Sequence, residues 1–147
     1  MSTSLDKITQ QREVIAWFEI HASNFERAVE FYRTALSFKV QVIILNGTRH
    51  GIVRNRFSDA RGAIVESATC GGETGPTLFF RSQYDVSLTL SNVVGAGGEV
   101  VMAKTLIKDS AGEGMTRIPF TLIDNRIGYF AKFKDSEGNL VAIYGNS

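Results

Sequence analysis

One pattern of predicted secondary structure occurs twice in this chain, and the repetition limits the fold more than any other feature. A strand-like segment at 13–21 precedes a helical pattern at 23–36, and a similar pair follows at 76–83 and 85–95, in register without a gap when Asn24 is placed on Asp85. Three further strand-like segments follow each helix. Because one βαβββ unit leaves a sheet face uncovered that a second can complete, the pattern predicts an α+β domain built from two such units.

The first unit carries local signals for its elements. A Ser-x-x-Glu capping box from Ser23 to Glu26 predicts the start of the helix, and apolar residues at helical spacing continue to Leu36. The segments 39–45, 50–57 and 62–66 are strand-like, and Asn46 with Gly47 predicts a turn after the first of them.

The second unit carries equivalent signals. Asp85 is a good N-cap, and the glycines from Gly95 to Gly98 predict the end of the helix. Strands are expected at 99–104, 128–135 and 140–144. The polar segment 106–126 is longer than the link expected there. It predicts an extra hairpin that covers a pocket or reaches a second subunit, or equally a surface elaboration.

Composition excludes several classes of partner. The chain has 147 residues, with 16 Lys and Arg against 15 Asp and Glu, interspersed rather than gathered, so no nucleic-acid or membrane partner is expected. Residues 1–12 predict a flexible lead-in, and no signal peptide is recognised there. The single Cys70 cannot form an internal disulfide, and we expect a cytoplasmic protein.

Four segments carry a resemblance to a known family. They are WFEI at 17–20, NFERAVEFY at 24–32, GGEVVMAKT at 97–105 and GYFAKFKDSEGNLVAIY at 128–144. Together they resemble the glyoxalase-like members of the vicinal oxygen chelate superfamily, which includes glyoxalase I, bleomycin resistance proteins and extradiol dioxygenases. The resemblance covers about residues 13–145. It implies one domain at 13–147, with modules at about 13–67 and 76–146, a curled mixed sheet around a cavity, helices on the outer face, and a homodimer.

The resemblance also implies where metal ligands would stand, and this chain departs from the pattern there. The two first-strand positions hold Trp17 and Leu78, and the last-strand position, four residues beyond Gly138, holds Ala142. Only Glu66, near the remaining position, has a side chain that suits a divalent ion. We therefore expect neither the usual metal nor another cofactor.

Candidate ligand-binding residues follow from strand alternation. With Trp17 facing the cavity, Glu19 and His21 share its face, and the second module adds Phe80 and the aromatic Tyr144. Each has a structural alternative. Trp17 and Phe80 also suit a core or dimer interface, His21 a solvated strand end, and Glu66 a strand end in water. His50 is expected at the surface.

Three functions remain open from the sequence. The preferred one is binding of a small aromatic or planar molecule in the sheet cavity without the standard metal. The alternative is an enzyme, a lyase, isomerase or dioxygenase, that uses a nonstandard metal set such as Glu19, His21 and Glu66, or Glu19 as an acid-base catalyst. A domain whose main task is protein association is the third.

Overall fold

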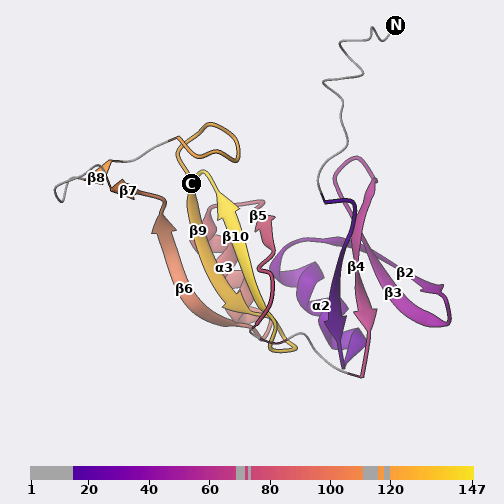
Figure 1. The fold of residues 1–147 in the computed structure, drawn as a ribbon. Helices are drawn as coiled ribbons and strands as arrows, with labels where there is room; N and C mark the ends of the chain where they lie inside the picture. The colour runs from indigo at the N-terminus through magenta and orange to yellow at the C-terminus, as the bar shows by residue number, and fades with distance from the viewer. Residues whose placement is uncertain (1–14, 69–71, 73, 111–115, 118–119) are drawn as a thin grey trace, which may run out of the picture.

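The computed structural model describes residues 15–68, 72, 74–110, 116–117 and 120–147, and it contains two four-stranded sheets (Figure 1). The first unit consists of β1 (Phe18–Ala22), α2 (Phe25–Ala35), β2 (Lys39–Leu45), β3 (Thr48–Arg54) and β4 (Ala60–Glu66). Its strands lie in the order β1-β4-β3-β2, and only β1 and β4 are parallel. The predicted lead-in at 1–12 and Cys70 lie outside the described residues.

The second unit repeats this arrangement. It consists of β5 (Phe79–Arg81), α3 (Val86–Gly95), β6 (Glu99–Leu106), β9 (Tyr129–Lys134) and β10 (Leu140–Gly145). Its strands lie in the order β5-β10-β9-β6, again with the first strand parallel to the last. The predicted α+β fold, with two βαβββ units forming curled mixed sheets and a helix packed on each, is confirmed.

Helix α2 starts one residue later than the capping-box pattern predicts. Asn24 is the N-cap, and its side chain accepts a hydrogen bond from the N–H of Arg27 at 3.1 Å. The hydroxyl of Ser23 instead donates to Glu137 at 3.4 Å. Asn caps a helix about as well as Ser, so the contact from the second unit decides between the two residues.

The end of α2 positions an aromatic side chain. Ser37 adopts a left-handed backbone conformation with φ of 58°, and the N–H of Phe38 donates to the carbonyl of Tyr32 at 3.2 Å. This turn closes the helix by satisfying one of its last carbonyls. It also places the Phe38 ring parallel to that of Tyr32, with 5.6 Å between centroids.

Both units contribute to one hydrophobic core. The helices α2 and α3 contact each other, and the ring of Phe31 in α2 lies 6.1 Å from that of Phe133 in β9. The hydroxyl of the fully buried Tyr32 donates to Asp135, after β9, at 2.6 Å. A second, smaller cluster of Ile52, Ala63 and Val65 lies on the other face of the first sheet. We call that side of each sheet, away from the helices, the open face.

Counted back from the N-cap of the following helix, the residues that face the helices differ by one position between the first strands of the two units. The gap-free alignment of the units predicted from sequence is therefore wrong at these strands. In β1, Phe18 and Ile20 face the helices, six and four residues before the N-cap Asn24. In the second unit, Leu78 and Phe80 face the helices, seven and five residues before the N-cap Asp85. The link from strand to helix is therefore one residue longer, and Phe80 points to the side opposite to the one predicted.

Element lengths also differ from those expected. The strand predicted at 76–83 pairs with β10 only at Phe79–Arg81, and the one predicted at 50–57 is β3, which ends at Arg54. The extra hairpin in the long segment is present as β7 (Asp109–Ser110) and β8 (Thr116–Arg117). It extends away from the end of β6 (Figure 1). Within the described residues, neither helix has the length and apolar character needed to cross a membrane.

Candidate ligand-binding site

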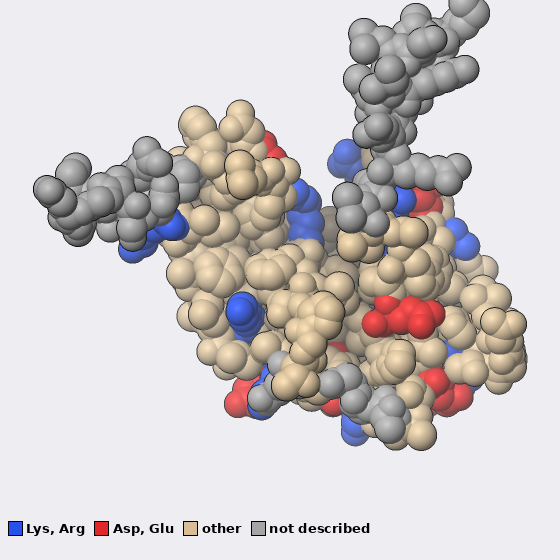
Figure 2. All heavy atoms as spheres, viewed as in Figure 1, with Lys and Arg blue, Asp and Glu red and all other residues tan. Residues whose placement is uncertain are grey.

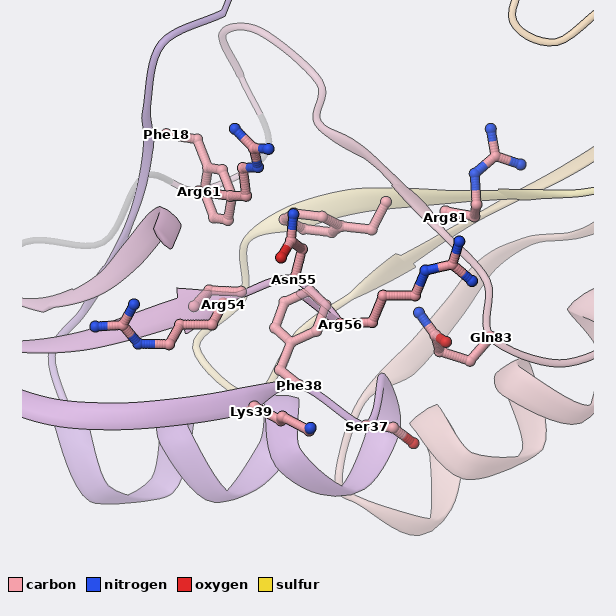
Figure 3. Close-up of a pocket in the computed structure, with 12 residues that line it drawn as sticks. Phe18, Ser37, Phe38, Lys39, Arg54, Asn55, Arg56, Arg61, Arg81 and Gln83 are labelled. Atoms are coloured by element: carbon pink, nitrogen blue, oxygen red, sulfur yellow. The ribbon is translucent and has the colours of Figure 1, made fainter. Parts of the chain in front are cut away.

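A hollow with a volume of about 430 Å³ lies between the two units. We call it the seam hollow, because the facing edge strands β1 and β5 both contribute to it. The turn after α2 and the loop between β3 and β4 form its other walls. This volume is within the usual range for small-molecule sites, roughly 300–1,000 Å³. The lining includes Phe18, Ser37, Phe38, Lys39, Val53, Arg54, Asn55, Arg56, Arg61, Phe80, Arg81 and Gln83 (Figure 3).

Three phenylalanine rings form the apolar part of the seam hollow. The ring of Phe80 lies 5.2 Å from that of Phe18 and 5.1 Å from that of Phe38, both in edge-to-face geometry. Tyr32 supports Phe38 from the core side by stacking. Rings fixed by their neighbours offer flat apolar surface with little loss of conformational entropy on binding. Phe80, predicted as a ligand contact, thus lines a hollow, although on the face opposite to the predicted one.

The polar part of the seam hollow is basic. The residues described along it include Lys39, Arg54, Arg56, Arg61 and Arg81, and no Asp or Glu. The face drawn in Figure 2 shows acidic and basic side chains scattered over both units, with Lys and Arg present where the two halves meet. The sequence reading missed this site. The available signal was three arginines within the segment 54–61.

Glu19 and His21, which stand on the open face of β1, line a second, smaller hollow of about 240 Å³ between β1 and the start of β10. Its lining also includes Leu78 and Leu140. Glu19 and His21 are thus brought together as predicted from strand alternation. Trp17 lies beside them, since its indole N–H donates to the Glu19 carboxylate at 3.3 Å.

His50 belongs to the same open face, contrary to the surface position expected from the sequence. Its side chain is only 12% exposed, because β3 pairs with β4 at this point, and its Nε2 lies 3.8 Å from Oε2 of Glu19. Its Nδ1 lies 2.9 Å from the carbonyl oxygen of Thr48. A carbonyl can only accept, so Nδ1 carries a proton and Nε2 is the nitrogen that faces Glu19.

Glu66 does not join Glu19 and His21. It pairs in register with Ala22, on the helix-covered side of the sheet, and its carboxylate accepts a hydrogen bond from Arg49, which also bonds Glu26 in α2. The hydrogen bond from Arg49 is the main reason that the pKa of Glu66 is lowered. Glu66 therefore closes an ion-pair network next to the start of α2.

Tyr144 lies under the loop that precedes β9. Its hydroxyl lies 2.7 Å from the hydroxyl of Thr121 and donates to Asp124 at 2.8 Å, and the Arg81 guanidinium stacks over its ring at 5.3 Å. Asp124 also accepts from Arg81 at 3.3 Å. Tyr144 therefore supports a wall residue of the seam hollow and is itself almost fully buried.

The residues at the ligand positions implied by the resemblance do not fit a metal ion. Trp17 and Ala142 stand at the expected positions, and in the second unit the one-residue shift moves the position from Leu78 to Thr77; none of these carries an imidazole or a carboxylate. The carboxylate of Glu66 is engaged by Arg49. Within the described part of the chain, no three His, Cys, Asp or Glu side chains converge. The nonstandard set of Glu19, His21 and Glu66 is split between two faces of the sheet.

Comparison with known proteins identifies the architecture through structure and not through sequence. No protein-family profile and no curated protein matches the chain. Solved structures do match over nearly the full length. A glyoxalase/bleomycin resistance protein from Albidiferax ferrireducens T118 has a TM-score of 0.57 at 13% identity, covering 90% of this chain and 99% of that one.

Two further solved structures give the same result. A glyoxalase/bleomycin resistance protein/dioxygenase family enzyme from Burkholderia phytofirmans PsJN has a TM-score of 0.55 at 15% identity, covering 90% of this chain and 98% of its own. A hypothetical protein from S. aureus has a TM-score of 0.55 at 20% identity, covering 92% and 97%. At such identities the likeness shows the fold.

Proposed function

We propose that this chain, which has the fold of the glyoxalase and bleomycin resistance proteins, binds a small planar molecule in the seam hollow without using a metal. The observation that carries the proposal is the edge-to-face cluster of Phe18, Phe38 and Phe80 lining a hollow of about 430 Å³. An aromatic ligand buries flat surface against such rings and keeps the edge-to-face or offset geometry that aromatic pairs prefer.

A fluorescent neutral probe, N-phenyl-1-naphthylamine, tests the proposal. Its emission should rise on addition of the protein and saturate at one probe per chain. Gln83→Trp places a bulky ring at the rim of the hollow, where the side chain is exposed, and should abolish the response. The matched control is Leu88→Trp, on the exposed side of α3, which should retain it. Equal responses from both variants would exclude the seam hollow as the site.

A second candidate function, proton transfer by an enzyme, is favoured by the contact between Glu19 and His50. The fixed Nδ1–H of His50 leaves its Nε2 beside the carboxylate, and both groups border the open face. The Glu19 carboxylate can accept a proton from a molecule placed against the pair, and the unprotonated Nε2 of His50 can take up that proton and return it.

Deuterium exchange tests this second candidate. Hydroxyacetone in D₂O, followed by NMR, should exchange its C–H protons faster with protein than without. Glu19→Gln should remove the acceleration while the far-ultraviolet circular dichroism stays unchanged. Acceleration that survives this substitution would show that Glu19 is not the base.

We also propose that the chain forms the homodimer implied by the resemblance and acts in the cytoplasm. Exposed apolar residues on the edge strand β2, Val42 at 47% and Ile44 at 69%, support an association surface. Light scattering after size-exclusion chromatography should give twice the mass of 16.2 kDa, and Ile44→Glu should give the monomer mass. Cell fractionation tests the location.

A further inference from the structure

The charge of the seam hollow differs from that of the whole chain. The chain is nearly neutral, with 16 basic and 15 acidic residues, yet the hollow is lined by five basic side chains and, among the described residues, by no carboxylate. They come from β2, from β3, β4 and the loop between them, and from β5. Segments far apart in the sequence thus bring like charges to one concave surface.

Two of the five cations already have acidic partners. Arg81 donates to Asp124 at 3.3 Å, and Arg61 lies 3.5 Å from Asp59. A third, Arg54, is held by neutral acceptors, the Gln41 side chain at 2.9 Å and the Ser58 carbonyl at 2.7 Å. Its guanidinium points away from Phe38 in Figure 3.

Arg56 and Lys39 are different. The guanidinium of Arg56 lies over the Phe57 ring, 4.7 Å from its centroid, and no carboxylate is paired with it among the described residues. In Figure 3 its side chain extends toward Gln83 and Arg81. Lys39 likewise has no ion-pair partner in the described part of the chain, and in Figure 3 its side chain extends from the rim on the side of Phe38 opposite to Arg56. The local excess of positive charge therefore concentrates beside the aromatic floor.

The loop that carries Arg56 is held in shape before any ligand arrives. The side-chain oxygen of Asn55 accepts from the backbone N–H groups of Phe57 at 2.9 Å and of Asp59 at 3.0 Å. The anchoring of Arg54 to the Ser58 carbonyl closes the same loop. A preorganised cation loses less conformational entropy when it binds an anion than one on a free chain.

From these observations we infer that the molecule bound in the seam hollow carries an anionic oxygen group, a carboxylate, sulfonate or phosphate, that Arg56 binds this group, and that Lys39 adds positive charge at the rim. The inference rests on the proposed function of the hollow. The planar part of the ligand lies on the phenylalanine rings, and its anionic group reduces the repulsion among the cations at the rim. Charge-assisted hydrogen bonds from a guanidinium suit such a group.

A matched pair of probes separates this inference from the proposed function. The neutral N-phenyl-1-naphthylamine and the anionic 8-anilinonaphthalene-1-sulfonate share a ring system and differ in one sulfonate. We expect the anionic probe to bind roughly tenfold more tightly at low salt. Added NaCl should remove most of this difference, because the groups involved are partly exposed. Equal affinities for the two probes at low salt would overturn the inference and leave the proposed function standing.

Variants that each remove one positive charge test which residues interact with the anionic group. Arg56→Gln should weaken binding of the anionic probe roughly fivefold, Lys39→Gln should weaken it by a smaller factor, and both should leave the neutral probe unchanged. The matched controls are Arg126→Gln and Lys108→Gln, exposed positions that do not line the hollow, and they should leave both probes unchanged. Loss of affinity for both probes in the Arg56 and Lys39 variants, or for neither, would contradict the assignment.

A titration without any aromatic probe makes the anion site testable by itself. Inorganic phosphate added to ¹⁵N-labelled protein should shift the backbone signals of Ser37, Asn55 and Arg56 in a saturable way, and Arg56→Gln should suppress the shifts. Saturable shifts without binding of the neutral probe would support the anion site and reject the planar-molecule function. Shifts that are absent, or that spread evenly over the surface, would overturn the anion site.

Discussion

The ring of Phe18 lies so close to Gly62 on the neighbouring strand that a Cβ at position 62 would come within 2.5 Å of its carbon atoms. The two residues are register partners in the parallel pair of β1 and β4. Glycine is therefore required at position 62 for the Phe18 ring to lie against the sheet, and that ring is part of the floor of the seam hollow.

Gly62→Ala should destabilise the protein by about 1–3 kcal/mol, because the Phe18 ring has to move and its contact with Phe80 is disturbed. Urea unfolding measures this loss, and the neutral probe should bind more weakly. The control is Gly95→Ala at the end of α3, where a Cβ meets nothing within 4 Å. That change should be neutral or stabilise the protein by up to about 1 kcal/mol. A fully stable Gly62→Ala protein would disprove the steric argument.

Tyr32→Phe should cost about 1–3 kcal/mol, because Asp135 would lose a buried donor at 2.6 Å. Burial and the neighbouring Asp135 charge both raise the pKa of Tyr32. The hydroxyl thus stabilises the fold fully below the ordinary tyrosine pKa of about 10, and this contribution is lost as pH rises further. Urea unfolding between pH 8 and 11 should therefore show a steeper fall for the wild type than for Tyr32→Phe. Tyr84→Phe, at an exposed position, should behave as the wild type.

Glu137 should make the contact between the units sensitive to acid. Its side chain is fully buried and accepts from Arg27 at 2.7 Å and from the N–H of Asn24 at 2.9 Å. Desolvation alone would raise the pKa of Glu137, but the bonds from Arg27 and Asn24 outweigh it and lower the pKa. The stabilisation is therefore present above the ordinary glutamate pKa of about 4.3 and is lost as pH falls through the lowered value.

Glu137→Gln tests this assignment. The substitution should lower the free energy of unfolding by about 1–2 kcal/mol at pH 7 and flatten its dependence on pH below about 4.3. Glu99→Gln, an exposed position in β6, should change neither. If the free energy of unfolding of Glu137→Gln fell with decreasing pH as steeply as that of the wild type, another carboxylate would dominate acid unfolding.

Asp124 should reduce the positive charge that the seam hollow offers to an anion, because its carboxylate pairs with Arg81. Burial alone would raise the pKa of Asp124, but hydrogen bonds from Tyr144, Asn146, Thr121 and Arg81 lower it to about 2. The carboxylate thus stabilises the loop above the ordinary aspartate pKa of about 3.9, and this stabilisation is lost as pH falls toward 2. Asp124→Asn should speed hydrogen exchange at the amide of Asn125.

The same substitution should also release Arg81 and tighten binding of 8-anilinonaphthalene-1-sulfonate severalfold. Unchanged or weaker anion binding would show that Asp124 does not offset the charge of Arg81 in the hollow.

The sequence predicted the fold well and the candidate site only in part. Glu19 and His21 share a face because strand alternation needs only one strand, and Trp17 joins them for the same reason. Phe80 was assigned to the wrong face because the link before α3 is one residue longer than its counterpart, and the sequence does not show which residue the link absorbs. His50 was placed at the surface because its neighbour in space, Glu19, lies on another strand.

The sequence by itself determined two successive βαβββ units, their caps and their turns, because apolar spacing, N-cap residues and the Asn46–Gly47 pair act between residues close along the chain. Only the tertiary structure decided that Phe18, Phe38 and Phe80 meet at the boundary of the two units and that Arg56 and Lys39 line the same hollow. That convergence depends on how two sheets and two helices pack, which is a relation between distant segments and leaves no periodic trace in the sequence.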